Sequence, residues 1–310
     1  ANILKAANAI ITKNEDRIPK ELWTEGDQGE LIKIYAAFNE RDEANFIVNR
    51  ISDWEKQGNR RTDTAIIYRS NAQSRALEEA LISASMPYRI YGGLRFFERS
   101  EIKDALAYLR LVVHQNDDTS FERIVNKPTR GIGAKALDNI RSCAKDNNFS
   151  LWEAACLLTK NDPTGTKYNK INYFISLINK MNRETENLEI HHKIDHLINL
   201  SGLIELYQKE KGERGLTRIE NLEELVTAAK SYEPDLEDEM SVLDAFLAHA
   251  ALESGEEQAG AWEDCVQLMT MHSAKGLEFP LVFMCGMEDG LFPHQRNILD
   301  SKTLEEERRL

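Results

Sequence analysis

The stretch CVQLMTMHSAKGLEFPLVFMCGM, residues 265–287, decides how this 310-residue chain folds. It contains two short apolar runs, 265–273 and 281–287, each bounded by glycine, proline or charged residues, and such runs are typical of buried β-strands. Two isolated strands do not form a stable sheet by themselves. We therefore expect them to complete a sheet whose other strands lie elsewhere in the sequence.

The N-terminal part of the chain supplies the partner strands. The apolar segments 30–38, 62–70 and 87–93 are predicted to be strands. The amphipathic segments 40–58 and 71–85 are predicted to be the helices between them. Strands that alternate with helices indicate a parallel α/β sheet, and the two late strands would bring it to five.

After Gly93 the pattern changes to helices until about residue 255. The predicted helices, separated by short polar or glycine-containing turns, are 98–114, 118–126, 133–147, 150–159, 167–184, 187–200, 202–211, 216–231 and 241–253. This block indicates a separate helical domain, inserted where the ends of the interrupted element lie close together. The predicted organisation is an α/β domain made of 1–94 and 262–310, with a helical domain inserted at 95–261.

The composition is that of a soluble globular protein, with 42% hydrophobic and 29% charged residues. No apolar run approaches the roughly 18 residues that a membrane span needs, so we expect a cytoplasmic location and no membrane partner. The four cysteines form no CxxC pair, and His191, His192 and His196 have no acid or cysteine at ligand spacing. We therefore expect no metal site.

The turn between the two late strands carries polar groups where ligands usually bind. In open α/β sheets, ligands sit outside the carboxyl ends of the strands. His272 and Lys275 suit contacts with phosphate, and Glu278 can accept hydrogen bonds from ribose hydroxyls. The alternative is an ordinary β-turn with solvated polar side chains, and spacing alone leaves both interpretations open.

The segment TRGIG, residues 129–133, is the informative part of the helical block. Glycines that flank an isoleucine at the entry to a helix let backbone N–H groups approach a phosphate, and the helix N-terminus adds a favourable partial charge. Residues 119–147 contain six basic and three acidic residues, a local +3 in a chain of net charge −13. The alternative is a helix-entry turn whose glycines serve steric needs only.

Seven segments of the chain, in the order found there, resemble the C-terminal half of the UvrD-type superfamily 1 DNA helicases, the group that includes PcrA and Rep. They are AIIYRSNAQSRALEEAL, MPYRIYGGLRFFERSEIKDALAYLRL, NKPTRGIGAKALDNI, TRIENLEELV, AFLAHAALESGEEQA, VQLMTMHSAKGLEFPLVFMCGMEDGLFP and LEEERRL. The resemblance covers essentially the whole chain. It implies a RecA-like domain, called 2A in this family, with a mobile helical domain, 2B, inserted in it.

The resemblance also implies roles for single residues. The family's motif V matches Thr270, His272, Lys275, Gly276, Leu277 and Glu278. The implied contacts with single-stranded DNA come from Thr270, His272 and Lys275, and the implied contacts with the ATP ribose come from Glu278 with Gly276.

Two further segments receive roles in the same way. In YRSNAQSR, Arg69 and Asn71 are implied contacts with the single-strand backbone, whereas Gln73 and Arg75 could simply cap or brace the helix that they begin. The implied grip on duplex DNA involves Thr129, Arg130, Gly131, Ile132 and Gly133.

The groups that hold a triphosphate are missing from the sequence. No GxxxxGK[ST] loop occurs, and no DE-x-Q strand end that could hold magnesium. We therefore expect no catalytic residue, no bound cofactor and no ATPase activity in this chain alone, with both γ-phosphate arginines of the family outside it. ATP with Mg²⁺ would bind in the full-length enzyme, between this α/β domain and a missing N-terminal RecA-like domain.

The implied activity of the full-length enzyme is ATP-dependent 3′ to 5′ helicase action on DNA in DNA repair. Its expected partners are single-stranded DNA, duplex DNA, the N-terminal domain and DNA repair proteins. A function of another class stays open from the residues alone, namely a stand-alone DNA-binding or partner-docking module without ATPase activity. A GxxxxGK[ST] loop upstream in the native reading frame would exclude that alternative.

Overall fold

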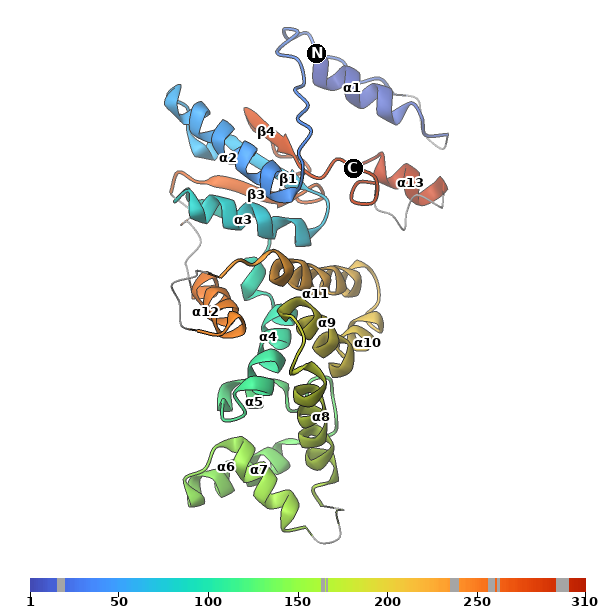
Figure 1. Cartoon of the computed structure of the whole chain (residues 1–310). Helices are drawn as coiled ribbons and strands as arrows, with labels where there is room; N and C mark the ends of the chain where they lie inside the picture. The colour runs from blue at the N-terminus through green and yellow to red at the C-terminus, as the bar shows by residue number, and fades with distance from the viewer. Residues whose placement is uncertain are drawn as a thin grey trace. The chain divides into compact units, whose positions relative to one another are not determined.

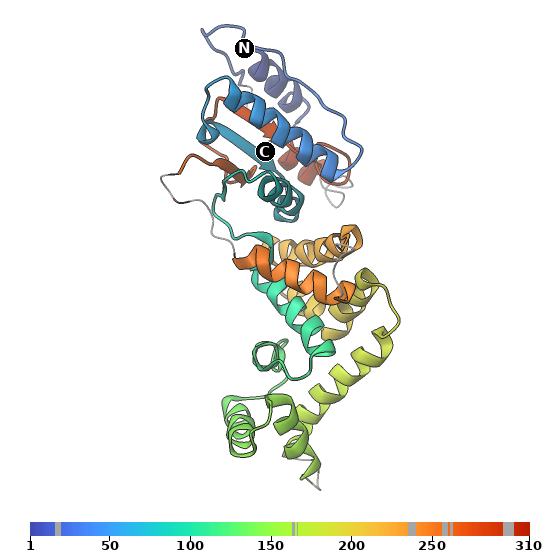
Figure 2. The same ribbon diagram turned by 60° about the vertical axis from the view of Figure 1, so that its left-hand side comes forward.

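The structure is a computed structural model of the chain, and it describes residues 1–15, 20–162, 165, 167–234, 240–255, 260, 263–293 and 301–310. Its residues group into two compact units (Figures 1 and 2). Unit 1 comprises Ala1–Gly93 and Gln258–Leu310, and unit 2 comprises Leu94–Glu257. Within the described ranges, no helix has the length and apolar character needed to cross a bilayer.

Unit 1 is built on a parallel sheet of four strands in the order β2-β3-β1-β4. The strands are β1 Thr64–Tyr68, β2 Tyr88–Ile90, β3 Val266–Thr270 and β4 Leu281–Met284. β3 lies between β1 and β2, with Leu268 opposite both Ile66 and Ile90, and β4 pairs with the other side of β1. The predicted α/β class, with late strands joining early ones, is confirmed. All four strands therefore end at one edge of the sheet.

The strand predicted at 30–38 is wrong. These residues form no strand, and Phe38 is 97% exposed and Ile34 94% exposed. Side-chain contacts hold the segment to the following helix instead. The Tyr35 ring stacks on Phe46 at 3.8 Å between centroids, and the Tyr35 hydroxyl donates to Asp42 at 3.0 Å. An apolar, β-type segment becomes a strand only where a neighbouring strand pairs with it, and here no pairing forms.

Two helices cover one face of the sheet (Figures 1 and 2). α2 runs over Glu40–Lys56 and α3 over Ser74–Ser83. Asn39 caps the start of α2 by accepting the Asp42 N–H with its side chain, and acidic residues in the first turn interact favourably with the positive end of the helix dipole. The apolar stripes of both helices pack on the inner residues of the strands; the cluster includes Ala44, Ile47, Val48, Ile51, Ile66, Tyr68, Leu77, Leu81, Tyr88, Val266 and Leu268.

The first and last helices of unit 1 meet near their ends. α1 runs over Asn2–Ile11 and α13 over Ser301–Glu307. The Asn14 side chain donates to the Glu305 carbonyl at 2.9 Å, and the Glu15 N–H donates to the Glu305 carboxylate at 2.9 Å. These two hydrogen bonds join residues that are 291 and 290 positions apart in the sequence.

Unit 2 is helical, and the predicted helices are confirmed with ends that agree within one helical turn. They are α4 Ser100–Val113, α5 Asp118–Ile124, α6 Ala134–Asn147, α7 Leu151–Lys160, α8 Asn169–Thr185, α9 Ile190–Ser201, α10 Leu203–Gln208, α11 Glu213–Ser231 and α12 Val242–Gly255. α4 is buried on nearly every side, as expected for a helix at the centre of a helical domain (Figure 1). One continuous apolar core surrounds it, built from residues between Phe96 and Ala250.

Candidate nucleic-acid and nucleotide interface

The carboxyl edge of the sheet brings two of the predicted segments together. Tyr68, the last residue of β1, lies opposite Thr270, the last residue of β3. The Met271 N–H donates to the Tyr68 carbonyl at 2.9 Å and extends this pairing beyond the strands. The segment that starts at Arg69 and the turn that starts at Thr270 therefore leave the sheet side by side, where ligands of open α/β sheets bind.

The turn after β3 is held by its own hydrogen bonds. The hydroxyls of Thr270 and Ser273 lie 3.0 Å apart, the Ser273 N–H donates to the Thr270 hydroxyl at 3.3 Å, and the Ala274 N–H donates to the Thr270 carbonyl at 3.0 Å. Gly276 has φ +84°, in the left-handed region that favours glycine. The Thr270 side chain is thus occupied in shaping the turn.

The remaining predicted residues of this turn face solvent. His272, Lys275, Gly276 and Glu278 are all exposed. In the part of the chain that the structure describes, the Lys275 ammonium and the Glu278 carboxylate make no ion pair with each other or with another residue. The turn is fixed by its own hydrogen bonds, and these charged groups are exposed. They can therefore donate hydrogen bonds to a ligand, or accept them from it, without a rearrangement of the turn.

Arg69 lies at the same edge but is engaged in a buried ion pair. Its guanidinium contacts the Glu307 carboxylate through two nitrogens, with Nε at 3.1 Å from Oε2 and Nη2 at 2.8 Å from Oε1. The Glu307 side chain is only 4% exposed. A phosphate would have to compete with this carboxylate for Arg69. Sequence reasoning missed Glu307, because 238 positions separate the two residues and no local pattern links them.

The residues after Arg69 form a compact cap for α3. Asn71 begins the short 3-10 turn η2, Asn71–Gln73, and is half-buried. The Gln73 side-chain oxygen accepts the N–H groups of Arg69 at 3.0 Å and Ser70 at 2.8 Å. Arg75 is buried and pairs with Glu79 at 2.7 Å. The geometry therefore favours the capping and bracing interpretation for Gln73 and Arg75.

The end of β4 is tied to the same cap. The Gly286 N–H donates to the Glu43 carboxylate at 3.0 Å, and burial raises the pKa of Glu43 above its ordinary value. Gly286 has φ +63°, and a Cβ added there would overlap the Gln73 amide. Only glycine fits this point, where the ends of β4 and β1 meet.

In unit 2, the segment 129–133 alternates between surface and interior. Thr129, Gly131 and Gly133 are exposed, Arg130 is half-buried, and Ile132 is 2% exposed and belongs to the apolar core. Gly131 has φ +74°, so the turn needs a glycine at that position. The structure thus presents the residues of this segment in two sets that face opposite ways.

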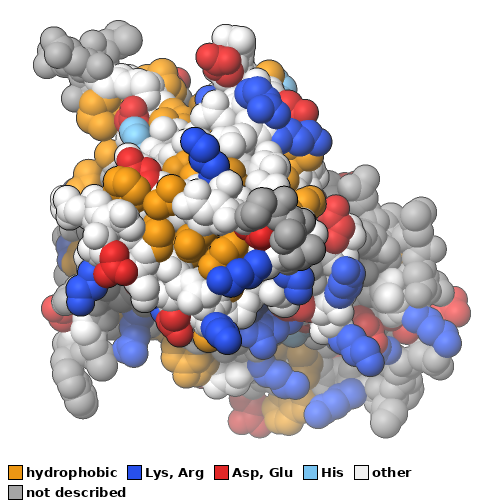
Figure 3. Space-filling view, turned by 90° about the horizontal axis from the view of Figure 1, so that it is seen from below, with side chains coloured by type: hydrophobic (Ala, Val, Ile, Leu, Met, Phe, Trp, Pro, Cys, Tyr) orange, Lys and Arg blue, Asp and Glu red, His pale blue; other side chains and the backbone are white. Residues whose placement is uncertain are grey.

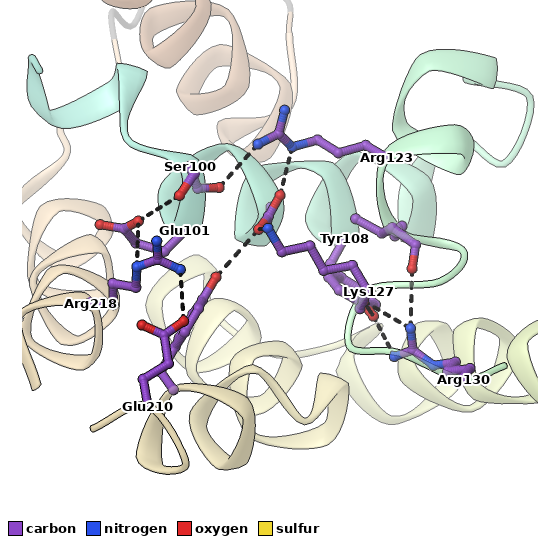
Figure 4. A network of polar contacts seen from close by, with 11 residues as sticks. Ser100, Glu101, Tyr108, Arg123, Lys127, Arg130, Glu210 and Arg218 are labelled. Atoms are coloured by element: carbon purple, nitrogen blue, oxygen red, sulfur yellow. Dashed lines mark hydrogen bonds and ion pairs between the residues drawn. The ribbon is translucent and has the colours of Figure 1, made fainter. Parts of the chain in front are cut away.

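The Arg130 guanidinium points inward and is surrounded by acceptors (Figure 4). Its Nη1 donates to the carbonyls of Ile124, Lys127 and Pro128 at 3.1, 2.8 and 3.2 Å. Its Nη2 donates to the Ser201 carbonyl at 3.0 Å and contacts the Tyr108 hydroxyl. Burial raises the pKa of Tyr108 to about 12.

Three of the six basic residues counted at 119–147 pair with carboxylates of unit 2. Arg123 and Lys127 both pair with Asp104, which is 1% exposed, and Arg141 pairs with Glu122 at 2.6 Å. Figure 3, which views the molecule from below, shows Lys and Arg side chains scattered among uncharged ones, with acidic side chains between them. A local set of donors, and not a broad basic surface, is what this region can offer to a phosphate.

Lys170 is a cation that sequence reasoning missed. It lies near the start of α8, and its Nζ donates to the Gly131 carbonyl at 3.3 Å. A Cβ added to Gly131 would collide with this ammonium group. Because 39 positions separate the two residues, no local motif marks Lys170 as a neighbour of the glycine turn.

The expectation that the histidines of α9 have no acid at ligand spacing is wrong, although the three histidines do not form one group. Within the described residues, His191 and His192 lie with Glu189 so that one ligand atom of each falls within 4.8 Å of the others, while His196 pairs with Glu184 at 2.9 Å. Glu189 and His192 are exposed. An exposed group of this kind is common without a metal, and we assign it no role.

Comparisons with known proteins indicate the same family as the sequence motifs. The family model described as UvrD-like helicase C-terminal domain matches residues 1–310. The chain is 56% identical over 312 residues to DNA helicase II of Escherichia coli K12 and 53% identical to DNA helicase II of Haemophilus influenzae; each match covers 100% of this chain and 43% of the relative. It is 42% identical over 314 residues to the ATP-dependent DNA helicase PcrA of Staphylococcus aureus, covering 99% of this chain and 42% of the relative. The chain thus spans less than half the length of these curated relatives.

Proposed function

The chain belongs to the family of UvrD-like helicase C-terminal domains, and on that premise we propose that it works as part of an ATP-dependent DNA helicase that moves 3′ to 5′ and acts in DNA repair. The family match supports this proposal over the alternative of a stand-alone module without ATPase activity. The observation that carries the proposal is the shared edge of the sheet, where the Arg69 segment and the Thr270 turn emerge from neighbouring strands with His272, Lys275 and Glu278 exposed.

Unit 1 corresponds, in this proposal, to the RecA-like domain 2A and provides one wall of the ATP site. Glu278 accepts hydrogen bonds from the ribose hydroxyls, and Gly276 lets the nucleotide approach the backbone. The support for these roles is the exposure of both residues and the positive φ that fixes the bend at Gly276. The other wall would belong to a separate RecA-like domain that carries a GxxxxGK[ST] loop and holds ATP with Mg²⁺.

The same edge supplies the contacts with single-stranded DNA. We assign them to His272 and Lys275 from the turn, to Thr270 once its hydroxyl leaves Ser273, and to Arg69 and Asn71 from the end of β1. Cationic and polar side chains of this kind bind phosphate and sugar without reading sequence. Arg69 reaches a phosphate only if its pair with Glu307 opens, so the pair would exchange partners as the strand moves.

Unit 2 corresponds to the inserted domain 2B and binds the duplex ahead of the single strand. The contacts come from Thr129 to Gly133, at the entry to α6. The exposed glycines and the first N–H groups of a 14-residue helix support this role, since they can approach phosphate oxygens closely. The partners of the whole helicase would be both forms of DNA and repair proteins, in the cytoplasm.

The proposal is tested by joining the chain to the N-terminal part of the native reading frame. The joined protein is expected to hydrolyse ATP when single-stranded DNA is added, and the 310-residue chain alone is expected to show no turnover. ATP hydrolysis by the chain alone, in a preparation free of other helicases, would contradict the proposal.

A matched pair of variants in the joined protein tests the ribose contact. Glu278→Gln is expected to raise the KM for ATP, because a neutral amide accepts the ribose hydrogen bonds less strongly than a carboxylate. Asp289→Asn, an exposed position after β4, serves as the control. Equal KM values for the two variants would remove Glu278 from the ATP site.

A further inference from the structure

We propose that Lys170 provides the positive charge of the duplex-binding turn, whereas Arg130 is a positioning residue that holds the turn from inside. This division of roles rests on the proposed function of residues 129–133. It reverses what the sequence suggests, because Arg130 is the only cation within TRGIG itself.

The contacts of Arg130 assign it to the interior. Its two terminal nitrogens reach four backbone carbonyls and the Tyr108 hydroxyl, so both of these nitrogens are engaged inside the domain. The guanidinium carbon also lies 5.7 Å from the Tyr108 ring centre and 5.5 Å from the Phe174 ring centre. A phosphate contact would require most of these bonds to break.

The acceptors of Arg130 are the backbone that leads into the turn. The carbonyls of Ile124, Lys127 and Pro128 precede the turn, and the Ser201 carbonyl comes from the end of α9. Arg130 therefore fixes the approach of the chain to the glycines against another helix. Tyr108 reinforces this arrangement, because its hydroxyl donates to the Lys127 carbonyl at 2.6 Å.

Asn126 bonds two of the backbone N–H groups of the turn and leaves the others available to a ligand. Its side-chain oxygen accepts the N–H of Arg130 at 2.8 Å and the N–H of Ile132 at 3.1 Å. Within the described residues, the N–H groups of Gly131, Gly133 and Ala134 have no acceptor. The inward residues thus have their N–H groups bonded inside, and the outward ones offer theirs to a ligand.

Lys170 lies on the outer side of the same turn. It is exposed, its Nζ is 3.3 Å from the Gly131 carbonyl, and no carboxylate pairs with it in the part of the chain that the structure describes. An ammonium group on a flexible stem can leave a carbonyl for a phosphate oxygen at little cost, since the phosphate carries a full charge. Lys170 therefore places a positive charge beside the available N–H groups.

The test measures the affinity of the 310-residue chain for a short blunt duplex over a range of salt concentrations, with an oligothymidylate strand measured in parallel. Lys170→Gln is expected to remove about one phosphate contact and so to reduce the slope of log K against log salt concentration by about one. This loss should weaken binding about eightfold at roughly 0.1 M salt. Lys180→Gln, on the same helix, is the control and should leave the salt dependence unchanged.

Arg130→Lys separates positioning from charge. The variant keeps the positive charge but loses the planar fork of the guanidinium. If Arg130 is a positioning residue, duplex binding should weaken about tenfold, because about one backbone residue of the turn would have to be ordered on binding. The salt dependence of binding should stay that of the wild type. Binding to the single strand should not change. Tyr108→Phe carries the same test if Arg130→Lys fails to fold, and it should weaken duplex binding to a smaller extent with no change in salt dependence.

Each result has one meaning. Wild-type duplex affinity in both Arg130→Lys and Tyr108→Phe would overturn the positioning role, and equal salt dependence in Lys170→Gln and Lys180→Gln would overturn the role of Lys170. If Gly133→Ser also leaves duplex binding unchanged, the turn does not touch the duplex, and the proposed function of this segment fails together with the inference.

Discussion

Replacing Gly131 with alanine should destabilise unit 2 by about 1–2 kcal/mol. Gly131 has φ +74°, a left-handed conformation in which a Cβ approaches the following carbonyl. An added Cβ would also meet the Lys170 ammonium, but that group ends a flexible side chain and can move aside. The backbone term therefore dominates the expected change in the free energy of unfolding.

Urea unfolding followed by far-ultraviolet circular dichroism measures this change, because most of the helices lie in unit 2. A domain of this size has an m-value of about 2 kcal/mol per molar urea, so the midpoint should fall by about 0.5–1 M. A wild-type midpoint for Gly131→Ala would refute the reasoning, since it would mean that the turn adopts another conformation at no cost.

Gly133 provides a matched control two residues away. Its φ of −85° and ψ of 173° suit any residue, no atom lies within 4 Å of an added Cβ, and it occupies the N-cap of α6. Serine is a preferred N-cap residue, so Gly133→Ser should keep the wild-type midpoint or raise it by a few tenths of a kcal/mol. In duplex binding, however, both variants should be weaker than the wild type, because each places a side chain where a phosphate would approach.

The remaining predictions concern unit 1. Glu307→Leu removes the carboxylate that Arg69, whose side chain is 16% exposed, contacts and should cost about 1–3 kcal/mol in urea unfolding; Arg69→Met in the same chain should recover most of that loss, and additive losses would contradict a direct pair. Burial raises the pKa of Glu43, so its charged form destabilises the fold at neutral pH, and this penalty is absent below the ordinary value of 4.5. Glu43→Gln, which keeps an acceptor, should therefore raise the Tm at pH 7 but not below pH 4.5; an equal gain at both pH values would exclude ionisation as the cause. Burial also raises the pKa of Cys285, so a thiol reagent should label the half-buried Cys143 in the native chain and Cys285 only after unfolding; equal labelling rates would contradict the burial.

The sequence was a reliable guide where a pattern depends on a whole element. The helices of unit 2 follow from apolar spacing over two or more turns, and the strands β1 and β3 from short apolar runs, so both were predicted with ends close to those observed. The segment 30–38 has the same composition as a strand but lacks a paired neighbour. Pairing is a property of the fold, and a single segment does not reveal it.

The sequence indicates where the candidate residues lie in the fold, but it does not show which of their charges are available. The exposed turn at His272 and Glu278 lies where a ligand of a parallel sheet would bind. Arg69 and Arg130, in contrast, were assigned to DNA because they are cations in suggestive motifs, and the structure shows both engaged by distant partners. Lys170 had no local signal at all. Which charges remain available depends on contacts between residues far apart in the sequence.

The order of the strands has a consequence for synthesis on the ribosome. β3 fills the place between β1 and β2, yet it is translated after all of unit 2. Until then, the two early strands have no partner between them and expose unpaired edges of the kind that promote aggregation. The residues of the unit 2 core, by contrast, are continuous in the sequence and can pack as soon as they emerge. Unit 2 would therefore be completed before unit 1, and slow translation of residues 258–284 would prolong the period in which a chaperone is needed.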